Sequence, residues 1–310
     1  MNTVHRLICC TLMIVSVHGV AEAAPAALQP TGTYAVDESD VIYARAADID
    51  LQAHIYRPQL KATLPAIIDI HGGAWSSGDR MSGRQYARAL ASAGVLVVSI
   101  DFRQAPLHQH PSASRDIAAA VRYVRSHAQQ LQIDAASIGL VGSSSGGHLA
   151  LLAALIPNST QFSGTQIAKD SGFTDANALD ASVRYVIALW PVSDPAYRYD
   201  YAKRVGRKEL SRSHDNFFGS REAMAQASVS RVLRAKEAED VPSLLLVHAG
   251  NDANIPREMT FDLLNAYQDA GGRVTYQFYP NQPHAFGHRA SAETDRLVAQ
   301  MRDFIAASVR

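Results

Sequence analysis

Residues 137–156 read SIGLVGSSSGGHLALLAALI, in which a short apolar run, a turn of small residues and a second apolar run of helical length follow one another. The first run has the unalternating apolar character of a strand that is buried on both faces. The turn GSSSG (142–146) comes next, and Gly147 adds a third glycine. So tight a strand-to-helix turn strains the backbone of its middle residue and tolerates only small neighbours. The stretch therefore predicts a nucleophile elbow in which Ser144 projects above a sheet.

The alternation of apolar strands and helix-length segments continues on both sides of this stretch. Further short apolar runs lie at 64–70, 94–100, 183–190, 243–250 and 274–279, and helix-length segments lie at 79–93, 112–130, 256–270 and from about 292 onward. Two extended stretches, 41–45 and 49–56, favour an antiparallel hairpin at a sheet edge. Strands that alternate with helices predict an α/β fold, a mostly parallel sheet with helices on both faces.

Composition and charge are those of an ordinary globular protein. The 310 residues are 47% hydrophobic and 19% charged, and Lys+Arg 29 balance Asp+Glu 29. A general nucleic-acid binder needs excess basic residues to displace counterions from phosphates, so we expect no nucleic-acid partner. Because single α/β domains often reach this length, we predict one domain over 24–310.

The N-terminal residues predict a secretory signal peptide over 1–23. An apolar run over 7–20 is followed by small residues that form a cleavage site before Ala24. The run is shorter than the roughly 20 residues of a spanning helix, so we expect a secreted or periplasmic mature chain without a membrane span. A retained anchoring helix is the alternative. Both cysteines lie inside this segment, so the mature chain would hold no thiol for disulfides, metal binding or nucleophilic attack.

A serine nucleophile needs a general base and an acid that orients the base. Asp252 and His284 follow successive predicted strands in the C-terminal part of the chain, in the order that the elbow motif requires. Both would lie at the carboxyl ends of strands, where open α/β sheets place their sites. We predict Asp252 as the orienting acid and His284 as the base. Asp194 is the alternative acid, and His288 is the alternative base.

The run HGGAW (71–75) ends the predicted strand at 64–70 in a glycine-rich turn. A tetrahedral intermediate needs N–H donors that are already in place, and a turn of this type supplies them from its backbone. We expect the amides of Gly73, Ala74 and Ser145 to form the oxyanion hole. Four further residues are expected to support this turn or to line the substrate pocket: His71, Gly72, Trp75 and Phe286.

Two segments, 157–181 and 195–240, are too long for plain connections in an α/β unit, which usually have about 2–6 residues. Both adjoin the strand predicted at 183–190. Insertions of this size often cover a binding site, so we predict that the two segments form a lid.

Five motifs carry a resemblance to a known family: HGGAW (71–75), DFRQAP (101–106), GSSSGGHLALLAAL (142–155), HAGNDANIP (248–256) and GGRVTYQFYPNQPHAFGH (271–288). Together they resemble the α/β-hydrolase superfamily over roughly residues 40–308. Within it, the chain is most similar to the esterase group that includes hormone-sensitive-lipase-like, acetyl-xylan/feruloyl-esterase-like and arylformamidase-like enzymes. Three residues depart from the pattern of that group: Ser143 in place of Asp or Glu, Ala74 in place of a third glycine, and Phe102 in place of Tyr.

The resemblance implies an α/β-hydrolase fold with an eight-stranded, mostly parallel sheet. It also implies a serine carboxylic-ester hydrolase that forms an acyl-enzyme with small or medium acyl esters, free or linked to carbohydrate, and that needs no metal or organic cofactor. The alternatives are an amidase, formamidase or peptidase with the same triad, or an inactive hydrolase-fold binding protein. The sequence gives no indication of the oligomeric state.

Overall fold

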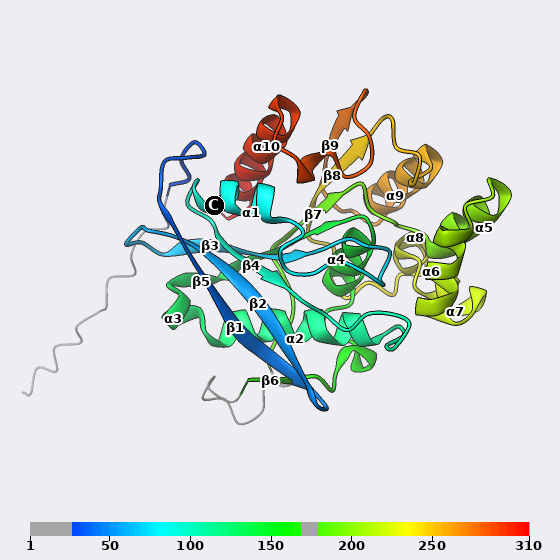
Figure 1. The fold of residues 1–310 in the computed structure, drawn as a ribbon, viewed down its shortest axis with the longest axis horizontal. Coiled ribbons are helices and arrows are strands. Elements are labelled where there is room, and N and C mark those ends of the chain that lie inside the picture. The colour runs from blue at the N-terminus through cyan, green and yellow to red at the C-terminus, as the bar shows by residue number, and fades with distance from the viewer. Residues whose placement is uncertain (1–26, 169–178, 310) are drawn as a thin grey trace, which may run out of the picture.

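The computed structural model describes residues 27–168 and 179–309 (Figure 1). The predicted signal peptide and part of the 157–181 insertion lie outside these residues. Within them, nine strands form one sheet in the order β6-β1-β2-β4-β3-β5-β7-β8-β9. The strands are β1 (Val36–Ala46), β2 (Ile49–Pro58), β3 (Leu64–Ile70), β4 (Leu96–Ile100), β5 (Ile133–Ser143), β6 (Gln166–Ile167), β7 (Tyr185–Leu189), β8 (Ser243–Ala249) and β9 (Val274–Tyr279).

The sheet is mostly parallel, as the alternating pattern predicts. In the order of the sheet, every neighbouring pair of strands from β4 through β3, β5, β7 and β8 to β9 is parallel. The strands β1 and β2 form an antiparallel hairpin, and β2 joins it to the rest of the sheet by antiparallel pairing with β4. Every residue of β3, β4 and β7 is buried, which explains why their sequences show no polar alternation. The prediction of eight strands was wrong by one, because β6 has only two residues and is too short to leave a hydrophobic pattern.

Helices cover both faces of the sheet. They are α1 (Arg84–Ala91), α2 (Ser112–Ser126), α3 (Ala128–Leu131), α4 (Ser145–Leu155), α5 (Pro195–Arg204), α6 (Lys208–Phe218), α7 (Arg221–Gln226), α8 (Val229–Arg234), α9 (Arg257–Asp269) and α10 (Ala292–Ser308). The first and last helices, α1 and α10, pack together on one face, and α2, α4, α8 and α9 lie on the other (Figure 1). Among the described helices, none is both long and apolar enough to cross a membrane.

The two insertions have different positions. Residues 195–240 form α5 to α8 between β7 and β8, and α5, α6 and α7 contact one another at one side of the molecule (Figure 1). The described part of 157–181 instead forms a short 3₁₀ helix and β6, which contact α2 and pair with β1 at the sheet edge. The prediction that both insertions form a lid is therefore wrong for the described part of 157–181.

The parallel strands bring four connections to one edge of the sheet. β3, β5, β8 and β9 run in the same direction, so the residues that follow each of them meet beyond the same carboxyl edge. The HGGAW turn follows β3 and the elbow follows β5. Asp252 and His284 lie on the loops after β8 and β9. Four segments that are distant in the sequence thus build one site.

Candidate active site

Ser144 lies at the tip of a strained turn between β5 and α4. Its φ of 55° and ψ of −118° place a non-glycine residue in a left-handed region of backbone space. The glycines around it are obligatory, because a Cβ on Gly142 would lie 2.3 Å from the carbonyl oxygen of Gly146. A Cβ on Gly146 would in turn lie 2.1 Å from the carbonyl oxygen of Ile70. The glycines at 142 and 146 therefore permit the tight turn from β5 into α4.

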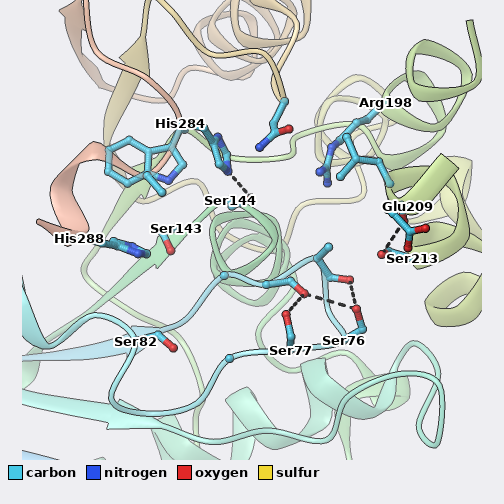
Figure 2. Close-up of a pocket in the computed structure, with 18 residues that line it drawn as sticks. Ser76, Ser77, Ser82, Ser143, Ser144, Arg198, Glu209, Ser213, His284 and His288 are labelled. Atoms are coloured by element: carbon cyan, nitrogen blue, oxygen red, sulfur yellow. Dashed lines mark hydrogen bonds between the residues drawn. The ribbon is translucent and has the colours of Figure 1, made fainter. Parts of the chain in front are cut away.

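Ser144, His284 and Asp252 form one row of hydrogen bonds. The Oγ of Ser144 is 3.0 Å from Nε2 of His284 (Figure 2). On the other side of the ring, Nδ1 of His284 is 2.7 Å from Oδ2 of Asp252. An ionised carboxylate only accepts hydrogen bonds, so Nδ1 carries the proton and Nε2 is free to accept from the serine. This is the tautomer in which an imidazole withdraws a proton from a hydroxyl group.

The carboxylate of Asp252 is fixed by its own loop. Its Oδ1 accepts hydrogen bonds from the amides of Asn254, at 2.7 Å, and Ile255, at 3.0 Å. The side chain is almost completely buried beneath His284. Three hydrogen bonds thus leave this carboxylate little rotational freedom and aim its second oxygen at the imidazole.

The two alternatives considered from the sequence have other positions. Asp194 is the N-cap of α5, and its Oδ1 accepts a hydrogen bond from the amide of Tyr197 at 2.9 Å. His288 lines the same pocket as His284, but its ring lies against Trp190, 6.1 Å away between ring centroids. Burial lowers the pKa of His288 to about 4. The geometry brings His284 and Asp252 to Ser144, and it brings neither alternative there.

The HGGAW turn approaches the serine closely. Gly73, Ala74 and Trp75 all have positive φ, at 110°, 50° and 59°. A Cβ on Gly72 would lie 3.1–3.3 Å from atoms of Ser143 and Ser144, so the glycine permits this approach. The amides of Gly73 and Ala74 donate no hydrogen bond to any residue that the structure describes. Two unpaired N–H groups beside a serine are suited to bind an oxyanion.

Side chains beneath the turn hold it in shape. The Oγ of Ser145 accepts a hydrogen bond from the amide of Trp75 at 3.2 Å, which ties the turn to the first residue of α4. His71 stacks on Phe102 with 4.2 Å between ring centroids, and its Nδ1 donates to the carbonyl of Gly72 at 2.6 Å. Burial lowers the pKa of His71, which favours the neutral form of its ring. His71 therefore braces the turn through its stacking contact and its hydrogen bond.

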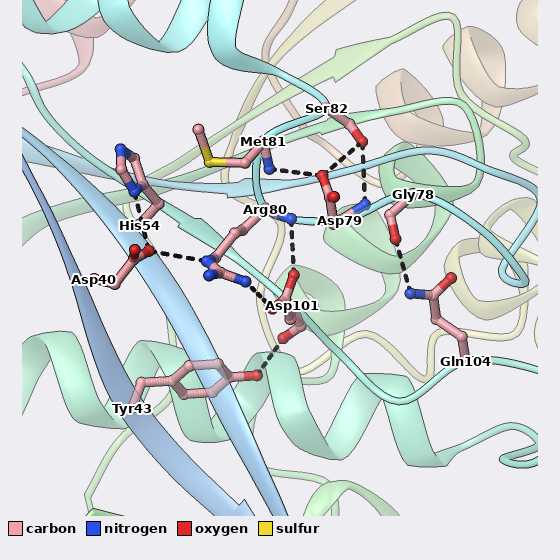
Figure 3. Close-up of polar contacts among 10 residues, drawn as sticks. All are labelled: Asp40, Tyr43, His54, Gly78, Asp79, Arg80, Met81, Ser82, Asp101 and Gln104. Atoms are coloured by element: carbon pink, nitrogen blue, oxygen red, sulfur yellow. Dashed lines mark hydrogen bonds and ion pairs between the residues drawn. The ribbon is translucent and has the colours of Figure 1, made fainter.

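The loop that follows the turn is anchored by a charged network that the sequence patterns did not indicate (Figure 3). Arg80 donates from Nε to Asp40, at 2.9 Å, and from Nη1 to Asp101, at 2.7 Å. Gln104 donates to the carbonyl of Gly78 at 3.0 Å. These contacts tie the loop to β1 and to the end of β4. The helix α1 begins after this loop, at Arg84 and not at the predicted residue 79.

A pocket of about 490 Å³ opens above the serine (Figure 2). It is lined by the turn and its loop (Gly72, Gly73, Ala74, Ser76, Ser77, Gly78 and Ser82), by the elbow (Ser143 and Ser144), by the insertion (Arg198, Glu209, Leu210 and Ser213), and by Trp190, Asn254, His284, Ala285 and His288. The insertion residues belong to α5 and α6. Segment 195–240 therefore forms one wall of the pocket.

Of the two roles expected for Trp75 and Phe286, support of the turn or lining of the pocket, the pocket-lining role is wrong, because neither residue lines the pocket. The positive φ of Trp75 turns its side chain inward, where it is fully buried and stacks on Phe217 with 5.4 Å between ring centroids. Phe286 packs behind the wall, 4.9 Å from Trp190. Trp190 is the aromatic residue that faces the pocket. The sequence marked it only as the end of an apolar strand.

A parallel sheet with a strained serine on a strand-to-helix turn defines the α/β-hydrolase fold. Solved structures share this architecture. Esterase B from Lactobacillus rhamnosis matches with a TM-score of 0.72 and 25% identity, over 91% of this chain and 89% of that chain. An esterase from Pyrobaculum calidifontis matches with a TM-score of 0.68 and 22% identity, over 89% of this chain and 87% of that chain.

A family model fixes the group more narrowly. The BD-FAE family model matches residues 53–267, and the chain belongs to this family. Among curated relatives, LipM of Mycobacterium tuberculosis, which is named a probable carboxylic ester hydrolase, is 27% identical over 268 residues. This match covers 85% of the present chain, which spans only 59% of the length of LipM.

Proposed function

We propose that the chain is a serine carboxylic-ester hydrolase in which Ser144 is the nucleophile, His284 the general base and Asp252 the orienting acid. The row of hydrogen bonds from Asp252 through His284 to Ser144, at the floor of a pocket, carries this proposal. The names of the relatives and of the solved structures support an ester as the substrate.

In the first step, the Oγ of Ser144 attacks the ester carbonyl while Nε2 of His284 takes the hydroxyl proton. The carbonyl π electrons move to the oxygen, which becomes an oxyanion. The amides of Gly73, Ala74 and Ser145 donate to that oxygen and stabilise its charge. Asp252 stabilises the imidazolium that forms and does not itself accept the proton.

In the second step, the intermediate collapses and the bond to the alcohol oxygen breaks. His284 returns its proton to that oxygen, the alcohol leaves, and Ser144 carries the acyl group. Water then attacks the acyl-enzyme with His284 again acting as base, and Ser144 is released with its proton restored. One ester and one water thus give one carboxylic acid and one alcohol.

The pocket supports small or medium acyl groups, since its volume of about 490 Å³ must hold both halves of the ester. Residues of α5 and α6 line one wall, so we infer that segment 195–240 sets the acyl and alcohol preference. The predicted leader supports a secreted or periplasmic mature chain.

The test uses 4-nitrophenyl acetate, butyrate and octanoate, beside acetylated xylan, a feruloyl ester and an N-formyl arylamine. Ser144→Ala should lower kcat on the best ester by about 10⁴- to 10⁶-fold. Ser163→Ala, an exposed serine-to-alanine change in the 157–181 insertion, is the matched control and should leave kcat unchanged. Near-normal turnover by Ser144→Ala would overturn the proposal, and turnover of the formyl arylamine alone would favour a formamidase.

A further inference from the structure

Arg198 of α5 brings an unpaired positive charge into the pocket. Its side chain points toward the pocket from the side opposite His288 (Figure 2), and the residue is only 1% exposed. Its Nε and Nη1 are buried without a hydrogen-bond partner. No carboxylate within the described residues lies close enough to form an ion pair with it.

The groups packed around Arg198 leave its charge uncompensated. The guanidinium lies over the ring of Trp75, 5.8 Å from the ring centroid. His148 and His214 are close by, and burial lowers the pKa of each to about 3, so both are neutral. The carboxylate of Asp252 attracts Arg198 from a distance but already binds His284 and two backbone amides.

Glu209 does not neutralise Arg198 either. It lines the same pocket, but its side chain is 83% exposed and pairs with Arg212 on α6 at 3.2 Å. Burial lowers the pKa of Arg198 to about 10, so the guanidinium remains charged at neutral pH. A buried cation without a partner is costly to the fold. Such a group is expected where a ligand supplies the missing anion.

We propose that Arg198 binds a carboxylate of the substrate, so that the preferred esters carry a free carboxylate in addition to the scissile ester. This inference rests on the proposed esterase function. A planar guanidinium presents two parallel N–H groups that match the two oxygens of a carboxylate. Since Arg198 and Ser144 line one pocket, a single ester could place its carbonyl at the serine and its carboxylate at the arginine.

The experiment compares esters that differ only in a carboxylate or a neutral carboxamide. One series has the group on the acyl side. It compares the 4-nitrophenyl monoesters of glutaric, adipic and pimelic acid with the same 4-nitrophenyl esters in which the free carboxylate is replaced by a carboxamide. The second series has it on the alcohol side: the butyrate ester of 4-hydroxyphenylacetic acid against that of 4-hydroxyphenylacetamide. A charge-assisted hydrogen bond should raise kcat/KM of the carboxylate in at least one pair by about 10- to 100-fold. The series that responds identifies the half of the ester that Arg198 holds.

Variants assign the preference to Arg198. Arg198→Gln should reduce the carboxylate-to-carboxamide ratio of kcat/KM about 10- to 100-fold, and Arg198→Lys should restore part of it. Arg204→Gln removes the same charge from an exposed position on the same helix and should leave the ratio unchanged. If the Arg198 variants do not fold, the carboxylate-to-carboxamide ratio of kcat/KM in the wild-type protein decides whether the proposal stands.

The outcomes separate the two proposals. If the wild-type protein hydrolyses the carboxamide esters at least as well as the carboxylate esters in both series, the proposed esterase function stands and the proposed role of Arg198 is overturned. A preference that survives in Arg198→Gln also overturns it. A protein that hydrolyses none of the esters, and that is not labelled by a fluorophosphonate, overturns the esterase function itself.

Discussion

Replacing Asp252 by Asn tests the orienting acid, and the structure indicates how the new side chain would lie. The amides of Asn254 and Ile255 both donate to Oδ1 of Asp252. An Asn side chain keeps these two hydrogen bonds only if its carbonyl oxygen occupies that place. Its NH₂ group then faces Nδ1 of His284, where the carboxylate now accepts.

This orientation inverts the tautomer of the base. Facing a donor, Nδ1 of His284 must accept, so the ring proton moves to Nε2, which then points a hydrogen at Ser144. The imidazole can no longer take the serine proton, and the charge that opposes the imidazolium is also lost. The same Asp-to-Asn change in a well-studied serine protease triad lowers kcat on the order of 10⁴-fold, and we expect a loss of that size here.

The assay is steady-state hydrolysis of a 4-nitrophenyl ester. The unfolding transition of each variant verifies that the assayed protein is folded. KM should change little, because the carboxylate acts mainly in the transition state. Asp194→Asn is the matched control, since Asn caps a helix about as well as Asp and the hydrogen bond to Tyr197 persists. If Asp194→Asn abolished turnover and Asp252→Asn left it nearly intact, the assignment of the acid would be refuted.

Three further predictions concern the turn, the core and the leader. Ser145→Ala removes the acceptor of the Trp75 amide and should lower kcat about 2- to 10-fold, measured on the same ester, through a looser oxyanion turn. Burial raises the pKa of Asp69 to about 6, so the native state holds its proton between about pH 4 and 6 while the unfolded chain does not. The contribution of this group to the free energy of unfolding of the wild type therefore falls as pH rises through that range. The free energy of unfolding of Asp69→Asn minus that of the wild type, measured by urea titration, should rise by up to about 3 kcal/mol over the same range. A difference that does not change with pH would contradict this prediction. Mass spectrometry of exported protein should find an N-terminus at or near Ala24, and an intact leader would contradict the predicted location.

The sequence predicts the elements with local signals and misses those decided by tertiary contacts. The elbow is predictable because Gly142 and Gly146 have no room for a side chain, and this requirement is written in a few adjacent residues. The parallel strands are predictable because burial on both faces removes polar alternation. The inward direction of the Trp75 side chain could not be predicted, because it depends on a positive φ that no local sequence pattern indicates for a tryptophan.

The pocket wall from α5 and α6 could not be derived from the sequence for a related reason. Helical periodicity indicates which face of a helix is buried, but not which element that face contacts. Arg198 falls in a polar stretch and gives no sign of being buried beside Trp75. The pairing of Arg80 with Asp40 and Asp101 likewise joins residues from three separate segments. Such contacts follow from the fold and are not visible before it.

The most direct test of the central claim is the site of reaction with a fluorophosphonate. The reagent should form one covalent adduct per chain, and peptide mapping by mass spectrometry should place it on Ser144 and not on Ser143 or Ser145. Heat-unfolded protein and Ser144→Ala should remain unlabelled, because only a serine activated by His284 reacts. An adduct on another residue, or no adduct on the folded wild-type protein, would contradict the assignment of Ser144 as the nucleophile.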